Sequence, residues 1–270
     1  MRIDLHNHTV HSDGKYTSKE LIERAVRNKV DIFALTDHDS VFGDDEIEKI
    51  AKDYPVKVIK GLELSTNHKD QSVHIVCLFK KNIIPEGMMK FSIEYKEKRK
   101  QRAILMMNKI HDIYGLKIDL DELLKSEVIT RANMMRNIAK CNNLSIEEAR
   151  KYIANDSKAY IPSTKLSVAD GVKLARENNC VVIFAHPCLV KEEYLDEILA
   201  CGFDGLEAKY PSPKNDYEKM KKYAEKYHLF ISAGSDCHGE GEGVVGDHGD
   251  IGTCTLDEVE FEPIKKLLEL

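Results

Sequence analysis

The chain has 270 residues, of which 42% are hydrophobic and 32% charged, so it is long enough for one large α/β domain or two smaller ones. Its formal net charge of -6 gives it no overall basic surface for nucleic acid. An anionic substrate would therefore have to be held by local charges or by metal ions.

The cysteines and the apolar runs indicate the cellular compartment. The seven cysteines are an odd number without a CxxC pair, which favours a reducing cytosol over a disulfide framework. No apolar run approaches the ~18 residues that span a bilayer. A signal peptide is not expected, because histidines already occur among the first ten residues. We expect a soluble, cytoplasmic protein that has no membrane contact.

The first residues combine a short strand with two candidate metal ligands. The strand-compatible residues 3–5 run directly into His6-Asn7-His8, and Asp13 follows five residues after His8. Side chains at positions i and i+2 of an extended backbone project from the same side. His6 and His8 could therefore reach one metal ion, although a His-x-His pair alone is a weak signal.

Strands alternate with helices up to residue 79. Thr17-Ser18-Lys19-Glu20 is a capping box that should open a helix ending near Lys29. A second helix is expected from Asp44 to about Asp53. The expected strands are residues 31–35, an extended segment formed by residues 56–59 and then 62–64, and residues 73–79. This alternation predicts a barrel or a doubly wound α/β fold.

The alternation stops between residues 85 and 153, where no convincing strand occurs. A long, charged helix is expected over Met88 to Tyr114. Shorter helices should open at Thr130 and at the capping box Ser145-Ile146-Glu147-Glu148. We interpret residues 85–153 as a helical insertion into a domain formed by residues 1–84 and 154–270.

The α/β alternation resumes after the insertion. The expected strands are 180–185, 204–207 and 229–233, and the expected helices are 167–178, 194–200 and 216–227. Residues 239–252 are rich in glycine and should form a loop, and an amphipathic helix should end the chain.

Residues that can bind metals recur at the ends of these strands. They are His6 and His8, His38, Glu63, His186, and Asp236 with His238, while His74 lies on a strand. In barrels and open parallel sheets, active sites assemble at the carboxyl edge of the strands. One histidine at a strand end can simply be hydrogen-bonded to backbone, but the same placement at five strand ends predicts a shared metal centre.

These residues belong to short motifs spread along the chain. The motifs are Asp4-Leu5-His6-Asn7-His8, Ser12-Asp13-Gly14, Thr36-Asp37-His38-Asp39, Gly61-Leu62-Glu63, Ala185-His186-Pro187 and Gly234-Ser235-Asp236-Cys237-His238-Gly239. With them the chain resembles the PHP family, the polymerase and histidinol phosphatase superfamily of metal-dependent phosphoesterases. The subgroup that it resembles consists of stand-alone bacterial enzymes that hydrolyse nucleotide phosphates, including 3′,5′-nucleoside bisphosphates.

The resemblance implies an α/β fold, a distorted (β/α)7 PHP barrel with a helical insertion, residues 85–153, that forms a cap subdomain over the active site. It also implies a centre of two to three divalent metal ions at the carboxyl face. The implied ligands are His6, His8, Glu63 and Asp236 for one ion, Glu63, His74 and His186 for a second, and Asp13, His38 and His238 for a third. Imidazole and carboxylate ligands without thiolate suit Mn²⁺, Fe²⁺ or Zn²⁺. Cys188 and Cys237 adjoin ligand positions, but we expect them to be structural.

The activity that the resemblance implies is hydrolysis of a phosphate monoester, foremost that of a nucleotide, AMP-like or a 3′,5′-nucleoside bisphosphate. Hydroxide generated at the metals would attack phosphorus. The alternatives are a histidinol-phosphate phosphatase, a 5′-3′ exoribonuclease that trims RNA ends, and a non-catalytic PHP module. The expected partner is a small phosphorylated substrate, with short RNA as an alternative, and no obligate protein partner is expected.

The candidate phosphate-binding residues are Arg131, Asn133 and Lys165. Arg131 opens a helix of the insertion, and both guanidinium groups and helix N-termini suit phosphate, although a surface salt bridge is its alternative role. Asn133 stands where relatives carry a histidine, and Cys188 follows the His-Pro where many relatives place an arginine. Lys165 or Lys191 could compensate. Because of these departures, the sequence does not decide whether the substrate is a 3′,5′-bisphosphate.

Other polar residues are ambiguous. His11 could assist a leaving group or lie exposed in a loop, and Asp37 could orient a ligand imidazole or close a turn. The basic run 95–102 could touch RNA, but its interspersed glutamates favour a solvated helix face. The histidines without a partner motif are expected to be incidental: His68, His111, His228 and His248.

Overall fold

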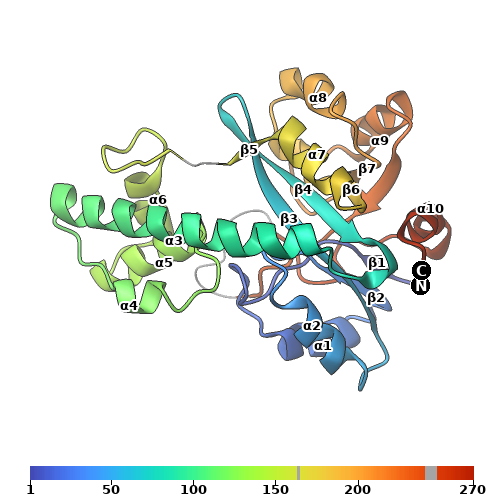
Figure 1. Cartoon of the computed structure of the whole chain (residues 1–270), viewed down its shortest axis with the longest axis horizontal. Helices are drawn as coiled ribbons and strands as arrows, with labels where there is room; N and C mark the ends of the chain where they lie inside the picture. The colour runs from blue at the N-terminus through green and yellow to red at the C-terminus, as the bar shows by residue number, and fades with distance from the viewer. Residues whose placement is uncertain (163–164, 241–247) are drawn as a thin grey trace.

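A computed structural model describes residues 1–162, 165–240 and 248–270 of the chain. Its strands form a strongly curved sheet (Figure 1). Their order across the sheet is β1 (Ile3–Asp4), β2 (Ile32–Leu35), β3 (Lys57–His68), β4 (Gln71–Phe79), β6 (Cys180–Phe184), β7 (Gly205–Lys209) and β8 (Phe230–Ala233). A short strand, β5 (Leu166–Ser167), pairs with the end of β3.

The two edges of the sheet meet just beyond β1 and β8. Leu5 donates a backbone hydrogen bond of 3.0 Å to Ala233, and Asn7 and Cys237 form a parallel bridge. Neighbouring strands are parallel except β4, which is antiparallel to both β3 and β6. The predicted distorted seven-stranded barrel is confirmed, and β4 is the source of its distortion.

Helices pack around the outside of this barrel. They are α1 (Ser18–Arg27), α2 (Asp44–Ala51), α7 (Val168–Glu177), α8 (Glu192–Leu199) and α9 (Tyr217–Lys226), with short 3-10 turns at η1 (Lys80–Asn82) and η2 (Pro187–Leu189). Helix α10 (Glu258–Leu268) instead packs against inward-facing side chains at one end of the barrel. The capping box at Thr17 is present at the start of α1, as predicted. Among the described residues, no helix is long and apolar enough to cross a membrane.

The two faces of each strand belong to different hydrophobic clusters, because side chains alternate along a strand. On β4, Val76 and Leu78 point into the barrel, where they pack with residues of α10 such as Phe261. Ile75 and Cys77 point outward and pack with α7 and α8. The inward face is therefore filled with apolar side chains at one end of the barrel, and polar side chains continue it at the other.

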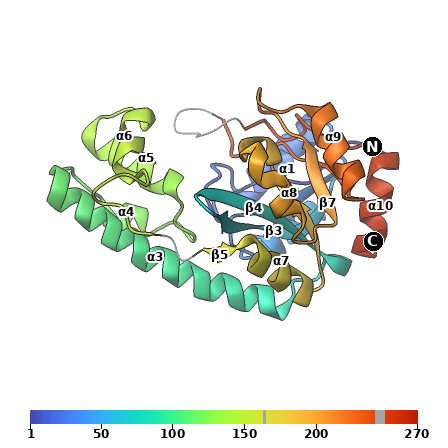
Figure 2. The same ribbon diagram turned by 90° about the horizontal axis from the view of Figure 1, so that it is seen from above.

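The remaining helices form a lobe beside the barrel. They are α3 (Glu86–Tyr114), α4 (Leu120–Leu123), α5 (Arg131–Asn142) and α6 (Ile146–Ile153). Both views show α3 running from the barrel out to α4, α5 and α6 (Figures 1 and 2). These helices share a separate apolar cluster that includes Met106, Ile110 and Ile138. The division of the chain into a barrel and a cap at residues 85 and 153 stays a prediction.

Strand β3 covers both parts of the extended segment expected at residues 56–59 and 62–64 and continues to His68. It is a single strand that continues through Lys60 and Gly61. A Cβ atom at Gly61 would lie 2.5 Å from the backbone oxygen of Cys77, so glycine permits the close approach of β4. Because β3 is unbroken, the inward face that carries Ile59 continues directly to Glu63.

Candidate metal centre

One end of the barrel brings together the histidines and carboxylates that the sequence analysis selected. They lie on or just after successive strands: His6 and His8 after β1, Asp13 in the loop beyond, His38 after β2, Glu63 on β3, His74 on β4, His186 after β6, and Asp236 and His238 after β8. Their side chains are buried or half-buried. The strand-end positions therefore converge in space as the parallel topology requires.

Glu63 lies in the middle of this group and uses its two oxygens differently. Its Oε1 lies 2.9 Å from Nδ1 of His74 and 2.9 Å from Nε2 of His186. Its Oε2 faces three further imidazole nitrogens at 2.8 to 3.4 Å, those of His6, His8 and His38. One carboxylate thus joins two sets of imidazoles, which is the geometry expected of a ligand shared by two ions.

Two further groups of ligand atoms flank Glu63. The Oδ1 atom of Asp236 lies 3.0 Å from Nε2 of His8 and 3.4 Å from Nε2 of His6. Asp13 lies 3.1 Å from Nε2 of His238. The groups whose ligand atoms all fall within 4.8 Å of one another include His6, His8, Glu63 and Asp236, and also His8, Asp13, His38 and His238. His8 therefore lies close to two of the three predicted ligand sets.

The charges of the centre balance one another. Burial alone would raise the pKa of Glu63, but nearby imidazoles, His38 foremost, outweigh burial and hold that pKa well below its usual range. The same balance holds the pKa of Asp13 and that of Asp236 well below normal. Burial lowers the pKa of His74 to about 3, so its imidazole is neutral at pH 7. The carboxylates are thus ionised, which is the form that binds metal ions.

Whether metal ions fit the centre can be judged from its buried polar atoms that have no hydrogen-bond partner. Several lie at ion-pair distance from one another without hydrogen-bond geometry: His6 Nε2, His8 Nε2, His38 Nδ1, Glu63 Oε2 and Asp236 Oδ1. Unpaired polar atoms in a buried site cost free energy. A divalent cation among imidazole nitrogens and carboxylate oxygens removes that cost. The residues present therefore fit divalent metal ions.

Comparison with known proteins agrees with this centre. The family model described as the PHP domain matches residues 4–84, which contain His6, His8, Asp13, His38, Glu63 and His74. The chain is similar along most of its length to a 5′-3′ exoribonuclease of Haemophilus influenzae, with 27% identity over 248 residues, 88% of this chain and 90% of the relative. Residues 4–84 thus match the PHP domain, and the similarity to relatives extends along most of the chain.

Two further similarities extend over most or all of the chain. A 3′,5′-nucleoside bisphosphate phosphatase of Chromobacterium violaceum is 29% identical over 257 residues, 89% of this chain and 88% of the relative. The crystal structure of an amidohydrolase from the same organism, with bound sulfate and no metal, superposes with a TM-score of 0.83 at 26% identity and covers 100% of this chain and 96% of its own. The fold shared with this structure therefore includes the helical lobe as well as the barrel.

A carboxylate behind the centre was missed in the sequence. Glu207, on β7, lies with Oε1 3.0 Å from Nδ1 of His6, and its Oε2 accepts a 2.6 Å hydrogen bond from the backbone N–H of His186. Such a carboxylate fixes the orientation and tautomer of a ligand imidazole. A Cβ atom at Gly234 would lie 2.1 Å from Glu207 Oε1, so glycine makes room for this contact. The available signal was a glutamate on a strand whose neighbours carry ligands.

Asp236 is also fixed by contacts on the side away from the other candidate ligands. Its Oδ2 accepts a 2.9 Å hydrogen bond from the Tyr210 hydroxyl and lies 3.0 Å from Nδ1 of His248. The other oxygen, Oδ1, is left to face His6 and His8. The expectation that His248 is incidental is therefore wrong. Residues 241–247 of the glycine-rich loop expected at 239–252 lie outside the described residues.

Glu207→Gln is expected to weaken Mn²⁺ binding or activity about 10- to 100-fold, because His6 loses a charged acceptor while the shape of the site is kept. Mn²⁺ titration with a competing chelator measures the affinity. Glu177→Gln, on the exposed face of α7, is the matched control and should behave as the wild type. Equal affinities for the two variants would show that Glu207 does not orient His6.

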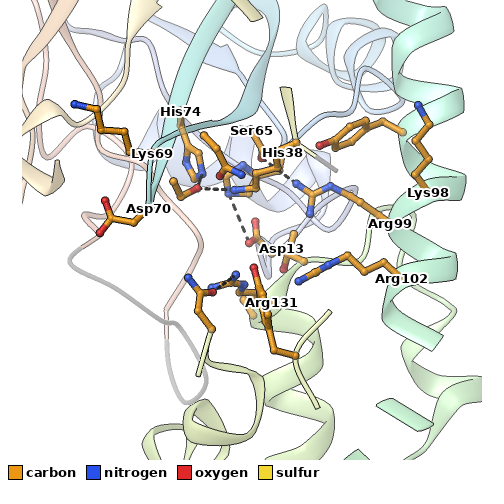
Figure 3. A pocket seen from close by; sticks show the side chains of 18 residues that line it. Asp13, His38, Ser65, Lys69, Asp70, His74, Lys98, Arg99, Arg102 and Arg131 are labelled. Atoms are coloured by element: carbon orange, nitrogen blue, oxygen red, sulfur yellow. Dashed lines mark hydrogen bonds and ion pairs between the residues drawn. The ribbon is translucent and has the colours of Figure 1, made fainter. Parts of the chain in front are cut away.

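A cavity of about 380 Å³ opens beside the centre (Figure 3). Asp13, His38 and His74 form its metal-facing wall. Its other walls come from the β3–β4 hairpin, from α3, and from the residues around the start of α5. The lobe therefore supplies part of the surface that would hold a molecule in this cavity against the centre.

Helix α3 contributes cations to the cavity, although Glu97, Lys100 and Gln101 of the run 95–102 are exposed, as expected of a solvated face. Figure 3 shows Arg99 and Arg102 reaching from α3 toward Asp13. Arg99 forms an ion pair with Asp39 and donates a 2.9 Å hydrogen bond to Ser65 Oγ. Arg102 donates from Nε to the backbone oxygen of Ile161. Both guanidinium groups are thus fixed in place by the protein before any ligand binds.

Two of the three predicted phosphate-binding residues line the cavity, and the third does not. Arg131 lines the cavity and donates a 2.7 Å hydrogen bond to Asn155 Oδ1. Lys165 lines it as well, and donates to Ser72 Oγ at 2.5 Å. Asn133 lies outside the described lining of the cavity, because its side chain completes a capping box with Thr130. The role of these residues in substrate binding stays a prediction.

The ambiguous residues near the centre have structural partners. Asp37 accepts hydrogen bonds from Thr9 and Ser12, so it closes the loop that carries Asp13. His11 is half-buried, with Nε2 2.9 Å from a carboxylate oxygen of Glu46 and Nδ1 3.4 Å from one of Glu127. Lys191 pairs with Asp70.

Proposed function

We propose that this PHP protein is a hydrolase of phosphoric esters that acts on a phosphate monoester of a nucleotide, AMP-like or a 3′,5′-nucleoside bisphosphate. The observation that carries the proposal is the juxtaposition of a cationic cavity with the candidate metal centre. Arg99, Arg102, Arg131 and Lys165 line the same cavity as Asp13, His38 and His74. Cations gathered opposite a metal centre favour a dianionic group that touches both.

The proposed metal ligands are those expected from the sequence, with Glu63 shared between two ions. The ions, Mn²⁺, Fe²⁺ or Zn²⁺, would supply Lewis-acid stabilisation of phosphoryl oxygens and a water of lowered pKa. Glu63, Glu207 and Asp37 hold the centre and its loop in place. Arg131, Arg102 and Lys165 would orient the phosphate, and Arg99 is fixed by Asp39 for the same purpose.

The cavity bears on the alternatives. Histidinol phosphate carries an ammonium group, which Arg99, Arg102 and Arg131 would repel. A non-catalytic module has no need of a centre whose candidate ligands all converge. An exoribonuclease is the second candidate, favoured by the similarity to the Haemophilus influenzae relative of that name and by Lys69 and Lys98 in the cavity lining. The net charge of -6 weighs against extended binding of RNA.

A phosphate-release screen with added Mn²⁺ tests the proposal. The substrates are 3′,5′-nucleoside bisphosphates, 5′-mononucleotides, histidinol phosphate and short 5′-phosphorylated RNA. We expect the highest kcat/KM on a nucleotide monoester. Preference for RNA of several nucleotides would replace this substrate with the second candidate. Folded, Mn²⁺-loaded protein that releases phosphate from none of them would overturn the proposal.

Lys165 should give substrate binding a distinct pH dependence. Burial, and after it the neighbouring Arg99, lower the pKa of Lys165 to about 7. Its ammonium group is charged below that pH and neutral above it. The wild-type KM for a phosphate monoester should therefore rise roughly tenfold as the pH increases through this range, which is the value of one charge-assisted hydrogen bond.

Two variants check this pH dependence. Lys165→Arg keeps a cation at every pH used and should hold KM low across the range. Lys165→Met should have a high KM throughout. The measurement is KM at a series of pH values with saturating Mn²⁺. Parallel profiles for the wild type and both variants would remove Lys165 from phosphate binding.

A further inference from the structure

The loop that carries Asp13 packs against the barrel. Hydrogen bonds and the small size of Gly14 fix it there. Ser12 Oγ donates to Asp37 Oδ1, and Gly14 N–H donates a 3.0 Å hydrogen bond to the backbone oxygen of Thr9. A Cβ atom at Gly14 would lie 2.7 Å from the backbone carbon of His8. The loop is therefore packed tightly against the segment that carries His6 and His8.

The other side of the same loop contacts helix α5. Arg136 donates a 2.7 Å hydrogen bond from Nη2 to the backbone oxygen of Asp13. Asn133, three residues earlier, approaches the backbone oxygen of Ser12 with its Nδ2 at 3.5 Å. Residues i and i+3 of a helix share a face, so one face of α5 rests on two consecutive carbonyl groups of the loop.

The choice of the carbonyl as acceptor has a chemical consequence. A guanidinium bound to the Asp13 carboxylate would occupy the oxygens that a metal ion needs. Arg136 instead binds the backbone oxygen, and the carboxylate stays directed at His238, 3.1 Å away, and at His38, 3.8 Å away. The positive charge still lies close enough to favour the ionised carboxylate.

Helix α5 also reaches the cavity. It begins at Arg131, which lines the cavity, and Arg136 lies little more than one turn further on. The helix therefore connects a candidate phosphate ligand to the backbone of a candidate metal ligand. Neither the barrel strands nor α3 make this connection to Asp13 among the contacts described above.

We propose that Arg136 is a positioning residue that fixes Asp13 for the metal ion shared with His38 and His238, and so couples the helical lobe to the metal centre. The inference rests on the proposed function only in taking Asp13 as a metal ligand. Residues behind a ligand typically change metal affinity about 10- to 100-fold when they are replaced. The effect should fall on that ion, because Arg136 binds the backbone of Asp13, which is proposed as a ligand of that ion alone.

Titration with Mn²⁺ against a competing chelator tests this proposal without relying on activity. In Arg136→Met, one equivalent of Mn²⁺ should bind about 10- to 100-fold more weakly than in the wild type, and the others should be unchanged. Arg136→Lys keeps the charge and should show a smaller loss, and it serves as the second variant if Arg136→Met does not fold. Lys140→Met, on the same helix but exposed and facing Glu122, is the matched control.

A kinetic measurement separates positioning from general loss of structure. At saturating Mn²⁺, Arg136→Met should regain most of the wild-type kcat, because excess metal compensates for weak binding. A variant that is merely unstable would instead show a lowered Tm and no rescue by Mn²⁺, and this result would overturn the proposal. Unchanged Mn²⁺ affinity in Arg136→Met and Arg136→Lys would overturn it as well.

Asp13→Asn distinguishes this inference from the proposed function. Loss of one Mn²⁺ equivalent in Asp13→Asn, together with wild-type binding in Arg136→Met, would refute only the role of Arg136. Unchanged binding in Asp13→Asn would refute the assignment of Asp13 as a ligand, on which the proposed function depends.

Discussion

Glu63→Gln is expected to abolish phosphate release, with a fall in kcat of at least about 10³-fold, which corresponds to roughly 4 kcal/mol of transition-state stabilisation. The amide keeps the shape of the side chain but removes its negative charge and replaces one oxygen by a hydrogen-bond donor. Oε1 faces His74 and His186, and Oε2 faces His38. The substitution therefore damages two ligand sets at once.

The metal content and the fold of the Glu63→Gln protein give this prediction its controls. Bound metal should fall by more than one equivalent relative to the wild type, while the far-UV circular dichroism should stay the same. Glu177→Gln changes an exposed glutamate in the same way and should keep full activity. Wild-type kcat together with full metal content in Glu63→Gln would show that the shared carboxylate has been wrongly identified.

Removing the metal ions should lower activity as much as Glu63→Gln does. It should affect the fold much less. After chelation, phosphate release should fall below about 10⁻³ of the starting rate and return when Mn²⁺ is added. The scaffold should persist, because apolar clusters inside and outside the barrel form without help from the centre. A moderate fall in Tm is expected, since ions that bind only the folded chain stabilise it by mass action.

The chelation experiment needs measurements of both structure and activity. Near-UV circular dichroism and the Tm should show a folded protein in the metal-free state, and metal analysis should confirm that the ions have been removed. Full activity in folded protein that contains no metal would contradict the proposed mechanism. Complete unfolding on chelation would instead show that the ions are structural as well as chemical.

Local sequence signals account for most of the secondary structure. The capping boxes at Thr17 and Ser145 mark the starts of α1 and α6, because a side chain that caps a helix acts on backbone groups only three residues away. The extended segment expected at residues 56–59 and 62–64 corresponds to β3, and Gly61 lies inside this strand. The glycine is explained by the closeness of Cys77 on the neighbouring strand, a contact that no local pattern contains.

Local sequence patterns also fail to predict the contacts around the candidate centre. Glu207 and Tyr210 lie far along the chain from His6, and on their own they carry no metal-binding motif. Arg99 lies in a charged run whose alternation of lysine and glutamate is typical of an exposed helix, yet the structure turns it toward Asp39. In each case the decisive partner comes from another element, so the spacing of residues contains no signal for the contact.

By itself, the sequence determined the metal-binding character of the protein, because the ends of parallel strands must meet at one edge of the barrel and the strand-end residues meet with them. It was therefore sufficient to place His6, His8, His38, Glu63 and Asp236 together. Only the tertiary structure decided which oxygen of Glu63 faces which imidazole, and which cations of the lobe face the cavity. Those choices depend on side-chain directions and on packing between distant segments, and neither is encoded in the spacing along the chain.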